Sequence, residues 1–313
     1  MSQLSVSALP KGDFGISAPV NVALKTNFAS NTAQSSALKN TANTAPADSA
    51  LRQLAGSFQP QAAATPPRAA SIASEHLVMG NPTSAVTNTN QPTNYLMEKK
   101  QYALSYNRDK GEANWVSWHL DSSWLGSAPR SREFTGDPAL PQGWYQVQNN
   151  DYSGSGYDRG HMTPSGDRTR SATDNAATFL TTNILPQAPK NNQRPWADLE
   201  NYCRDLTKQG NELYVVSGGF GDKGKIAAGK VTVPTHTWKV IMVLPKADGN
   251  DVARVTDKTR TIAVWMPNEN NLNPDWRSHR VSVDFIEQKT GYNFFSNVSK
   301  TIQDKIEARV DNK

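Results

Sequence analysis

Apolar and polar residues alternate along several segments of the chain from residue 101 onward. Two of these segments, residues 101–107 (QYALSYN) and 114–120 (NWVSWHL), flank the turn-forming sequence RDKGEA. A period of two is typical of half-buried strands, and the short polar connection predicts a hairpin. Further strands are predicted at residues 212–219 (ELYVVSGG), 231–245 (VTVPTHTWKVIMVLP) and 261–267 (TIAVWMP).

Helical patterns lie between and after these strands. Residues 171–183 predict a short helix with Ser171 or Thr173 as its cap, and residues 282–291 and 301–310 predict two closing helices. Strands and helices follow one another without a strict βαβ rhythm. The expected fold class is therefore mixed α+β rather than a doubly wound sheet.

A further helix is predicted after an irregular segment. Residues 185–195 (LPQAPKNNQRP) are expected to form a loop, and Pro195 suits the first turn of a helix that ends at Gly210. Cys203, the only cysteine in the chain, falls within this helix. It excludes an intramolecular disulfide and a cysteine-based metal cage, and its position predicts a packing role.

The first quarter of the chain has a different composition. Residues 1–75 are rich in Ala, Ser, Thr, Gln, Asn and Pro and contain no tryptophan or tyrosine. Such a segment cannot bury enough apolar surface to offset the entropy lost on ordering. We therefore expect residues 1–75 to be disordered and residues 76–313 to form the single folded domain.

The charge of the chain favours anionic partners. Its formal net charge is +5, which is compatible with nucleic acid or an anionic membrane surface without choosing between them. No apolar run approaches the length of a membrane span, so we expect no membrane partner. The N-terminus shows no standard signal peptide.

One short segment gathers the residue types that phosphodiester chemistry requires. Residues 153–171 read SGSGYDRGHMTPSGDRTRS and combine one histidine with arginines, aspartates and glycines. Cleavage of a phosphodiester needs a base for the attacking water and positive charge for the transition state. Histidine supplies a base near neutral pH, and arginines or a divalent cation supply the charge. An ordinary solvated loop is the alternative interpretation.

Two segments point to a family. Residues 157–168 (YDRGHMTPSGDR) and 191–206 (NNQRPWADLENYCRDL) resemble the DNA/RNA non-specific endonucleases, the ββα-metal family with the signature Asp-Arg-Gly-His, and most closely their cyanobacterial-type, sugar-non-specific members. The resemblance implies a mainly antiparallel central sheet flanked by helices. It also implies one hydrated Mg²⁺ or Mn²⁺ and cleavage of single- and double-stranded DNA and RNA to 5′-phosphate ends.

The resemblance also implies the role of individual residues. His161 corresponds to the general base and Asn192 to the only protein ligand of the metal. Glu200 corresponds to the residue that orients the waters of the hydrated ion. Arg204 corresponds to a phosphate-contacting arginine, and Arg130, with Arg132 as a rival, corresponds to an arginine that stabilises the transition state. Arg159 and Asp158 complete and shape the motif, and Gly160 is expected to allow a sharp turn.

Each assignment has a structural alternative. Glu200 and Arg204 lie one helical turn apart and could form an exposed ion pair. Asp158 and Arg159 could form a structural salt bridge. The four other histidines are interpreted as structural. His119 alternates with Trp118 and Trp115 in a predicted strand, and the other three lack clustered acidic residues; they are His76, His236 and His279.

Two other functions are compatible with a basic, tryptophan-containing domain. A non-catalytic nucleic-acid-binding protein would use charge and base stacking but would have no need of His161, Asn192 and Glu200 together. A metal-dependent phosphatase is the weaker alternative. Because a non-specific nuclease endangers its own cell, we expect secretion or a periplasmic location, or a protein inhibitor.

Overall fold

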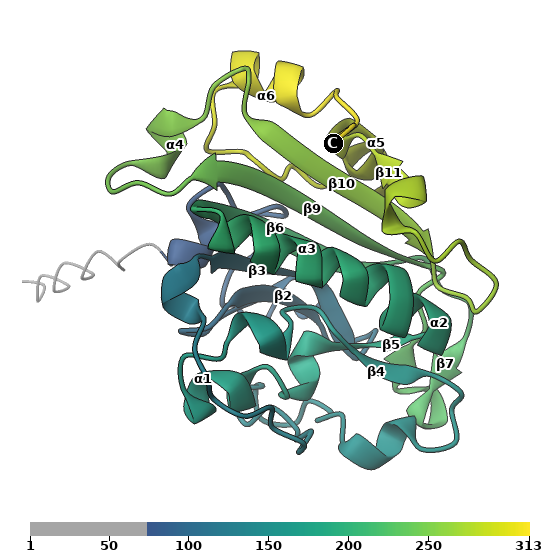
Figure 1. Ribbon diagram of the computed structural model, residues 1–313. Coiled ribbons are helices and arrows are strands. Elements are labelled where there is room, and N and C mark those ends of the chain that lie inside the picture. Colours follow the sequence, from purple (N-terminus) through teal and green to yellow (C-terminus); the bar gives the residue numbers. More distant parts are fainter. Residues whose placement is uncertain (1–73) are drawn as a thin grey trace, which may run out of the picture. The chain divides into compact units, whose positions relative to one another are not determined.

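A sheet of seven antiparallel strands is the centre of residues 74–313, the part of the chain that the computed structural model describes (Figure 1). Its strands, in spatial order, are β1 (Tyr95–Glu98), β2 (Ala103–Asn107), β3 (Glu112–Leu120), β6 (Asn211–Phe220), β9 (His236–Pro245), β10 (Arg260–Pro267) and β11 (Arg280–Val281). The predicted hairpin is β2–β3, and the α+β fold with a mainly antiparallel central sheet is confirmed.

Shorter elements surround this sheet. Two separate two-stranded ladders are β4 (Asp158–His161) with β5 (Ile184–Gln187) and β7 (Lys225–Ile226) with β8 (Val231–Thr232). The α-helices are α1 (Ala172–Ala177), α2 (Pro189–Asn191), α3 (Ala197–Lys208), α4 (Asp251–Arg254), α5 (Val283–Thr290) and α6 (Lys300–Ile306). The single helical turns are η1 (Glu75–Leu77), η2 (Ser122–Trp124), η3 (Asn149–Tyr152), η4 (Ser165–Asp167), η5 (Thr181–Asn183), η6 (Asn192–Trp196), η7 (Ala227–Gly229) and η8 (Trp276–His279).

Both faces of the central strands are buried. Successive side chains of a strand point to opposite sides of the sheet. Val215 and Ile241 therefore join the core that includes α3, whereas Val216 and Met242 join the core that includes α5 and α6. Figure 1 shows α3 lying across the sheet, with β4 and β5 beside it. This arrangement explains the nearly continuous apolar sequence of β9.

The helical segment that ends with α3 begins earlier than the sequence predicts. Residues 185–195 were expected to form a loop, but α2 begins at Pro189 and the π-helical turn η6 connects it to α3. Pro195 lies inside that turn and has no N–H to donate. A proline ring also clashes with the carbonyl four residues earlier in a regular α-helix, and the wider turn relieves this clash. The expected loop is therefore strand β5 up to Gln187 and a helical segment with a local irregularity from Pro189 onward.

The Asp-Arg-Gly-His segment is a strand and not a turn. It forms β4, in which Gly160 lies opposite Leu185 and His161 lies opposite Ile184 of β5. A Cβ atom added at Gly160 would lie 2.1 Å from Oε1 of Gln187. Gly160 is thus required for the close approach of the Gln187 side chain, and the expectation that it allows a sharp turn is wrong.

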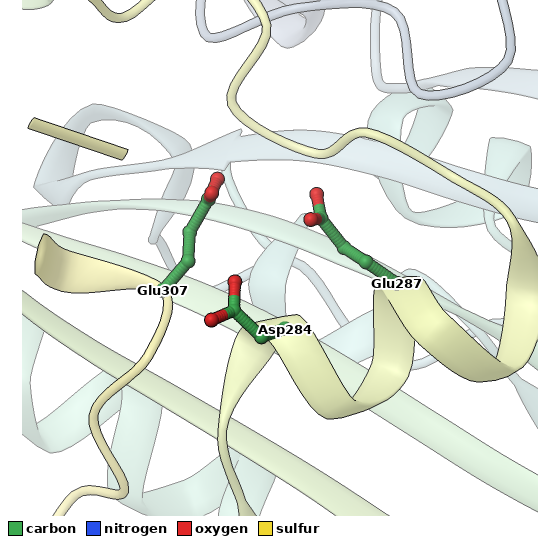
Figure 2. Close-up of side chains that lie close together, drawn as sticks. All are labelled: Asp284, Glu287 and Glu307. Atoms are coloured by element: carbon green, nitrogen blue, oxygen red, sulfur yellow. The ribbon is translucent and has the colours of Figure 1, made fainter. Parts of the chain in front are cut away.

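Helices α5 and α6 meet on the side of the sheet opposite α3. The backbone N–H of Asp284 donates to the carbonyl of Glu307 at 3.1 Å. Three carboxylates converge at this junction, those of Asp284, Glu287 and Glu307 (Figure 2).

Two other expectations concern the N-terminal segment and membrane-spanning helices. The segment that was expected to be disordered, residues 1–75, lies outside the described residues except for residues 74 and 75, so its disorder stays a prediction. Within residues 74–313 the helices are too short or too polar to cross a bilayer.

The buried face of β9 yields a prediction about stability. Ile241 is fully buried between β6 and β10. Replacing it by alanine removes apolar contacts and leaves a cavity, so Ile241→Ala is expected to lower the free energy of unfolding by about 2–5 kcal/mol. Denaturant unfolding measures this loss. Val310→Ala is the control, because Val310 is 53 % exposed and its truncation should change stability by less than about 0.5 kcal/mol. Equal losses in the two variants would contradict the assigned core.

Candidate active site

A pocket of about 470 Å³ brings the predicted site residues together beside α3. Its walls come from β4, the segment that follows β4, the turn η6 and α3. Every predicted site residue except Asp158 lines it, namely Arg130, Arg159, His161, Asn192, Glu200 and Arg204. The rival Arg132 is exposed and does not line the pocket.

His161 presents an unpaired ring nitrogen. It is the last residue of β4 and is 7 % exposed, and its Nε2 atom is buried without a hydrogen-bond partner among the described residues. The ring of Phe179 packs edge-on against the imidazole with a centroid distance of 4.7 Å. Burial, and next the positive charge of Arg130, lower the pKa of His161 to about 3. The imidazole is therefore neutral at neutral pH and can accept a proton.

Asp158 connects the strand of His161 to the helix of Asn192. Its Oδ2 atom accepts hydrogen bonds from Nδ2 of Asn192 at 2.9 Å and from Nε2 of Gln193 at 2.8 Å. Because Asp158 engages the nitrogen of the Asn192 amide, the amide oxygen remains available as a ligand. An amide oxygen is the kind of hard donor that Mg²⁺ and Mn²⁺ prefer.

Three arginines reach the pocket from three different segments. Arg130 donates to the hydroxyl of Ser165 and lies over the ring of Phe179. Arg159 donates to the backbone carbonyl of Asn149 at 2.6 Å, and its Nε atom is buried without a partner. Fixed guanidinium groups of this kind suit the oxygens of a phosphate.

Arg204 is held by an aspartate that the sequence analysis did not single out. Nη1 of Arg204 donates to Oδ1 of Asp167 at 2.8 Å, and the indole N–H of Trp118 donates to Oδ2 of Asp167 at 3.0 Å. The predicted Arg204 thus keeps a defined position at the pocket wall. Asp167 lies in η4, six residues after His161, but nothing in the sequence marks it as the partner of Arg204.

Glu200 has a buried cationic neighbour. Its side chain is 14 % exposed, and Nζ of Lys239 lies 3.7 Å from its Oε1 atom. Lys239 is 1 % exposed and lies over the ring of Trp196. Burial raises the pKa of Glu200 to about 7, and Lys239 opposes this rise. A lysine inside the apolar strand sequence HTWKVIMVLP was a signal that could have identified this residue.

The two structural alternatives for the charged residues do not form. Among residues 74–313, Arg204 pairs with Asp167 and not with Glu200. Asp158 accepts from two side-chain amides, whereas Arg159 donates to a backbone carbonyl. Glu200 and Arg204 therefore do not form an ion pair with each other, and neither do Asp158 and Arg159.

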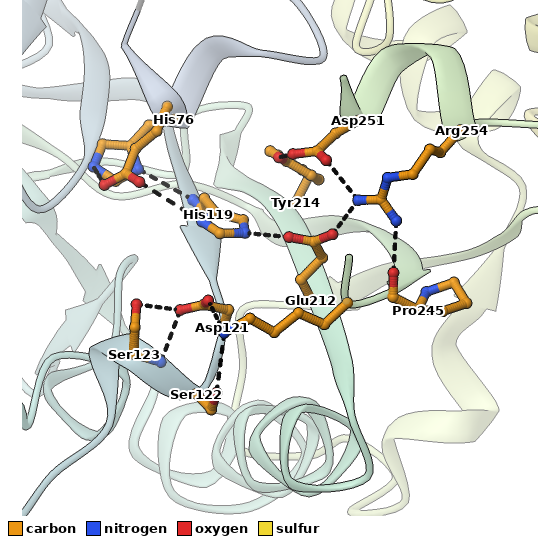
Figure 3. Close-up of polar contacts among 12 residues, drawn as sticks. His76, His119, Asp121, Ser122, Ser123, Glu212, Tyr214, Pro245, Asp251 and Arg254 are labelled. Carbon is orange, nitrogen blue, oxygen red and sulfur yellow. Dashed lines mark hydrogen bonds and ion pairs between the residues drawn. The ribbon is translucent and has the colours of Figure 1, made fainter. Parts of the chain in front are cut away.

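The other histidines lie outside the pocket, and His119 of β3 belongs to a polar network. Its Nε2 lies 3.0 Å from Oε2 of Glu212 and its Nδ1 lies 3.9 Å from Oε2 of Glu75 (Figure 3). Arg254 also pairs with Glu212, and His76 accepts a hydrogen bond from the backbone N–H of His119. This network connects η1, β3, β6 and α4, which supports the structural interpretation of His119.

Comparisons with known proteins agree with this geometry. The family model described as DNA/RNA non-specific endonuclease matches residues 79–301. A nuclease of Nostoc sp. is 56 % identical over 239 residues, which cover 76 % of this chain and 87 % of that protein. The human mitochondrial nuclease EXOG is 35 % identical over 215 residues, 64 % of this chain and 56 % of that protein.

A solved structure is also similar. The complex of EndoG with EndoGI, a structure of inhibited EndoG, matches with a TM-score of 0.58 and 28 % identity. The match covers 72 % of this chain and 91 % of the compared chain. With a family model that spans most of the sequence and a relative that is more than half identical, the chain belongs to the DNA/RNA non-specific endonuclease family.

Proposed function

We propose that the pocket hydrolyses phosphodiester bonds of DNA and RNA, with His161 as the general base and one hydrated divalent cation at Asn192. The observation that carries this proposal is the unpaired, buried Nε2 atom of His161 in a pocket that Asn192, Glu200 and three arginines also line. No observation favours a non-catalytic binding protein, because such a protein would not need these groups in one pocket.

His161 acts on the attacking water. Its neutral imidazole accepts a proton as the water attacks phosphorus in line. A bound phosphodiester brings negative charge next to the ring, and this favours proton uptake by a group whose pKa burial has lowered. The bond from phosphorus to the 3′ oxygen breaks, the departing oxygen takes a proton from solvent, and a 5′-phosphate end remains.

The donor set fits a hard divalent cation. Asn192 offers its amide oxygen because Asp158 holds its amide nitrogen, and Glu200 is placed on the next turns of the same helical segment to bind coordinated waters. When bound, Mg²⁺ or Mn²⁺ supplies charge stabilisation for the phosphoryl oxygens. That the bound ion is one of these two is part of the proposal.

The arginines position the substrate. Arg130 and Arg159 each keep part of the guanidinium on a protein partner, which fixes the orientation of the remaining donors. Arg204 is fixed by Asp167 in the same way. The remaining guanidinium donors would bind phosphate oxygens, which carry no sequence information, and this agrees with cleavage of both DNA and RNA.

We also propose that the producing cell is protected from the nuclease activity of this chain. The similar EndoG structure is a complex in which EndoGI inhibits EndoG, and this similarity supports a protein inhibitor as a partner of this chain. Export to the periplasm or the medium is the other way to protect the producing cell. If export protects the cell, expression of the chain without an inhibitor should be tolerated. If an inhibitor protects the cell, the same expression should be toxic.

Loss of the proposed base should abolish turnover without abolishing binding. His161→Ala is expected to lower the rate of plasmid nicking by about 10²–10⁴-fold, the usual contribution of a general base. Gel-shift affinity and the unfolding midpoint should stay close to those of the parent. His279→Ala serves as the matched control, because His279 lies outside the pocket. Nicking by His161→Ala at the parental rate would refute the assignment.

The proposed metal ligand should affect the cation requirement. Asn192→Ala is expected to shift the Mg²⁺ concentration for half-maximal cleavage upward by about tenfold or more, because the single protein ligand is lost. Digestion of plasmid and RNA across a Mg²⁺ series, with EDTA as the zero point, measures the shift. Gln193→Ala is the control that keeps the Asn192 amide. An unchanged Mg²⁺ dependence in Asn192→Ala would exclude it as the ligand.

Lys239 should control the acid side of the pH profile. Glu200 must be ionised to accept hydrogen bonds from coordinated waters, so activity falls as pH drops through its pKa, about 7. Lys239 lowers that pKa; removing the charge in Lys239→Met raises it, and protonation then begins at higher pH. The loss of kcat/KM should be at least about threefold larger at pH 6 than at pH 9. Lys246→Met, at an exposed lysine paired with Asp121, should keep the parental profile. Equal losses at both pH values would show that Lys239 acts only on stability.

A further inference from the structure

A second cation site is suggested by the three carboxylates at the junction of α5 and α6. One carboxylate oxygen each of Asp284, Glu287 and Glu307 lies within 4.8 Å of the others, and Figure 2 shows the three groups turned toward one another. Asp284 is exposed and Glu287 is half-buried, whereas Glu307 is buried. Like charges at this spacing repel one another unless a proton or a cation lies between them.

The carboxylate of Glu307 lacks the partners that a buried charge requires. Glu307 is 1 % exposed, and its Oε1 atom is buried without a hydrogen-bond partner among residues 74–313. Burial, and next the carboxylates of Glu287 and Asp284, raise its pKa to about 8. A buried, unpaired acceptor is costly and is retained only where something satisfies it.

Neighbouring groups do not supply this partner. The nearby Lys300 pairs with Asp304 on the exposed side of α6. One oxygen of Glu287 accepts from the backbone N–H of Phe294 at 2.9 Å, which fixes this carboxylate but contributes no positive charge. The backbone bond from Asp284 to the Glu307 carbonyl holds the two helix ends together and leaves the carboxylates facing one another.

We propose that Asp284, Glu287 and Glu307 bind one Ca²⁺ ion that joins α5 to the end of α6. Ca²⁺ takes oxygen ligands at about 2.3–2.6 Å, so two ligands on opposite sides of the ion lie about 4.6–5.2 Å apart. The three oxygens lie within 4.8 Å of one another, close enough to share one such ion. Mg²⁺ demands near-octahedral geometry and usually binds through one or two carboxylates, whereas Ca²⁺ accepts several carboxylates in a flexible geometry, so a cluster of three carboxylates fits Ca²⁺ better.

The site is separate from the catalytic pocket. Val283 and Ile286 of α5 and Ile306 of α6 belong to the core on one face of the sheet, whereas Leu199 and Cys203 of α3 belong to the core on the other. The ion therefore stabilises the layer of α5 and α6 and does not take part in phosphodiester cleavage. It differs from the catalytic ion in its ligands, which are three carboxylates and not one amide.

The test uses the full chain with the catalytic site disabled. Asn192→Ala protein is treated with EDTA, dialysed and then titrated with CaCl₂, followed by calorimetry and thermal unfolding. We expect one Ca²⁺ per chain and a rise of the unfolding midpoint of about 3–8 °C at 10 mM Ca²⁺, with a smaller rise at equal Mg²⁺. Adding Glu307→Gln to this background should remove the Ca²⁺ heat and the midpoint shift.

Two more variants make the result decisive. Asp284→Asn changes an exposed ligand, so it should fold normally and lower Ca²⁺ affinity by about tenfold or more. Glu98→Gln removes an exposed carboxylate from β1 at the opposite edge of the sheet and should keep the full shift. The proposal is overturned if Ca²⁺ produces no midpoint shift in the parent background, or if the shift is the same in Asp284→Asn and Glu98→Gln. Neither result would bear on His161 or Asn192.

Discussion

The carboxylate of Asp158 is the contact on which the geometry of the pocket depends. It lies on β4, three residues before the proposed base, and it holds the amides of Asn192 and Gln193 on the helical turn η6. Strand and helix are thereby fixed relative to each other at the point where a phosphate would bind. Preorganisation of this kind means that the reacting groups need not be rearranged when the substrate arrives.

A second constraint is the burial of charge behind the pocket. Glu200 and Lys239 face each other between α3 and the sheet, where isolated charges are expensive. Apolar residues at both positions would make a better core, so the pair indicates that function and not stability determines these residues. The aromatic rings of Trp118 and Trp196 surround the ammonium and reduce the cost of its burial.

The sequence predicted the parts of the fold whose signal is local. β6 and β10 were predicted from their apolar patterns, and the β2–β3 hairpin from its short polar connection. The single strand predicted at residues 231–245 is two strands, β8 and β9. The resemblance to a known family supplied the residues of the pocket. Local patterns misjudged the Asp-Arg-Gly-His segment, because glycine and charged residues suggest a turn when the partner strand is unknown.

What the sequence could not predict depends on contacts between distant residues. Lys239 reaches Glu200 across 39 positions, and Glu307 meets Asp284 across 23 positions. No spacing rule connects such pairs before the sheet forms and places two helices on each other. The network of His119 shows the same limitation, since its acidic neighbours come from η1 and β6.

The helical turn η6 also limits how the length of the chain can vary. A helix advances by about 100° for each residue, so one residue inserted between Asn192 and Glu200 would turn the Asn192 amide away from Asp158 while α3 stayed packed. The exposed connection at residues 246–250 has no such restriction, and extra residues there would cost little. Natural or engineered insertions in this domain should therefore be sought in that connection and not in the few residues before α3.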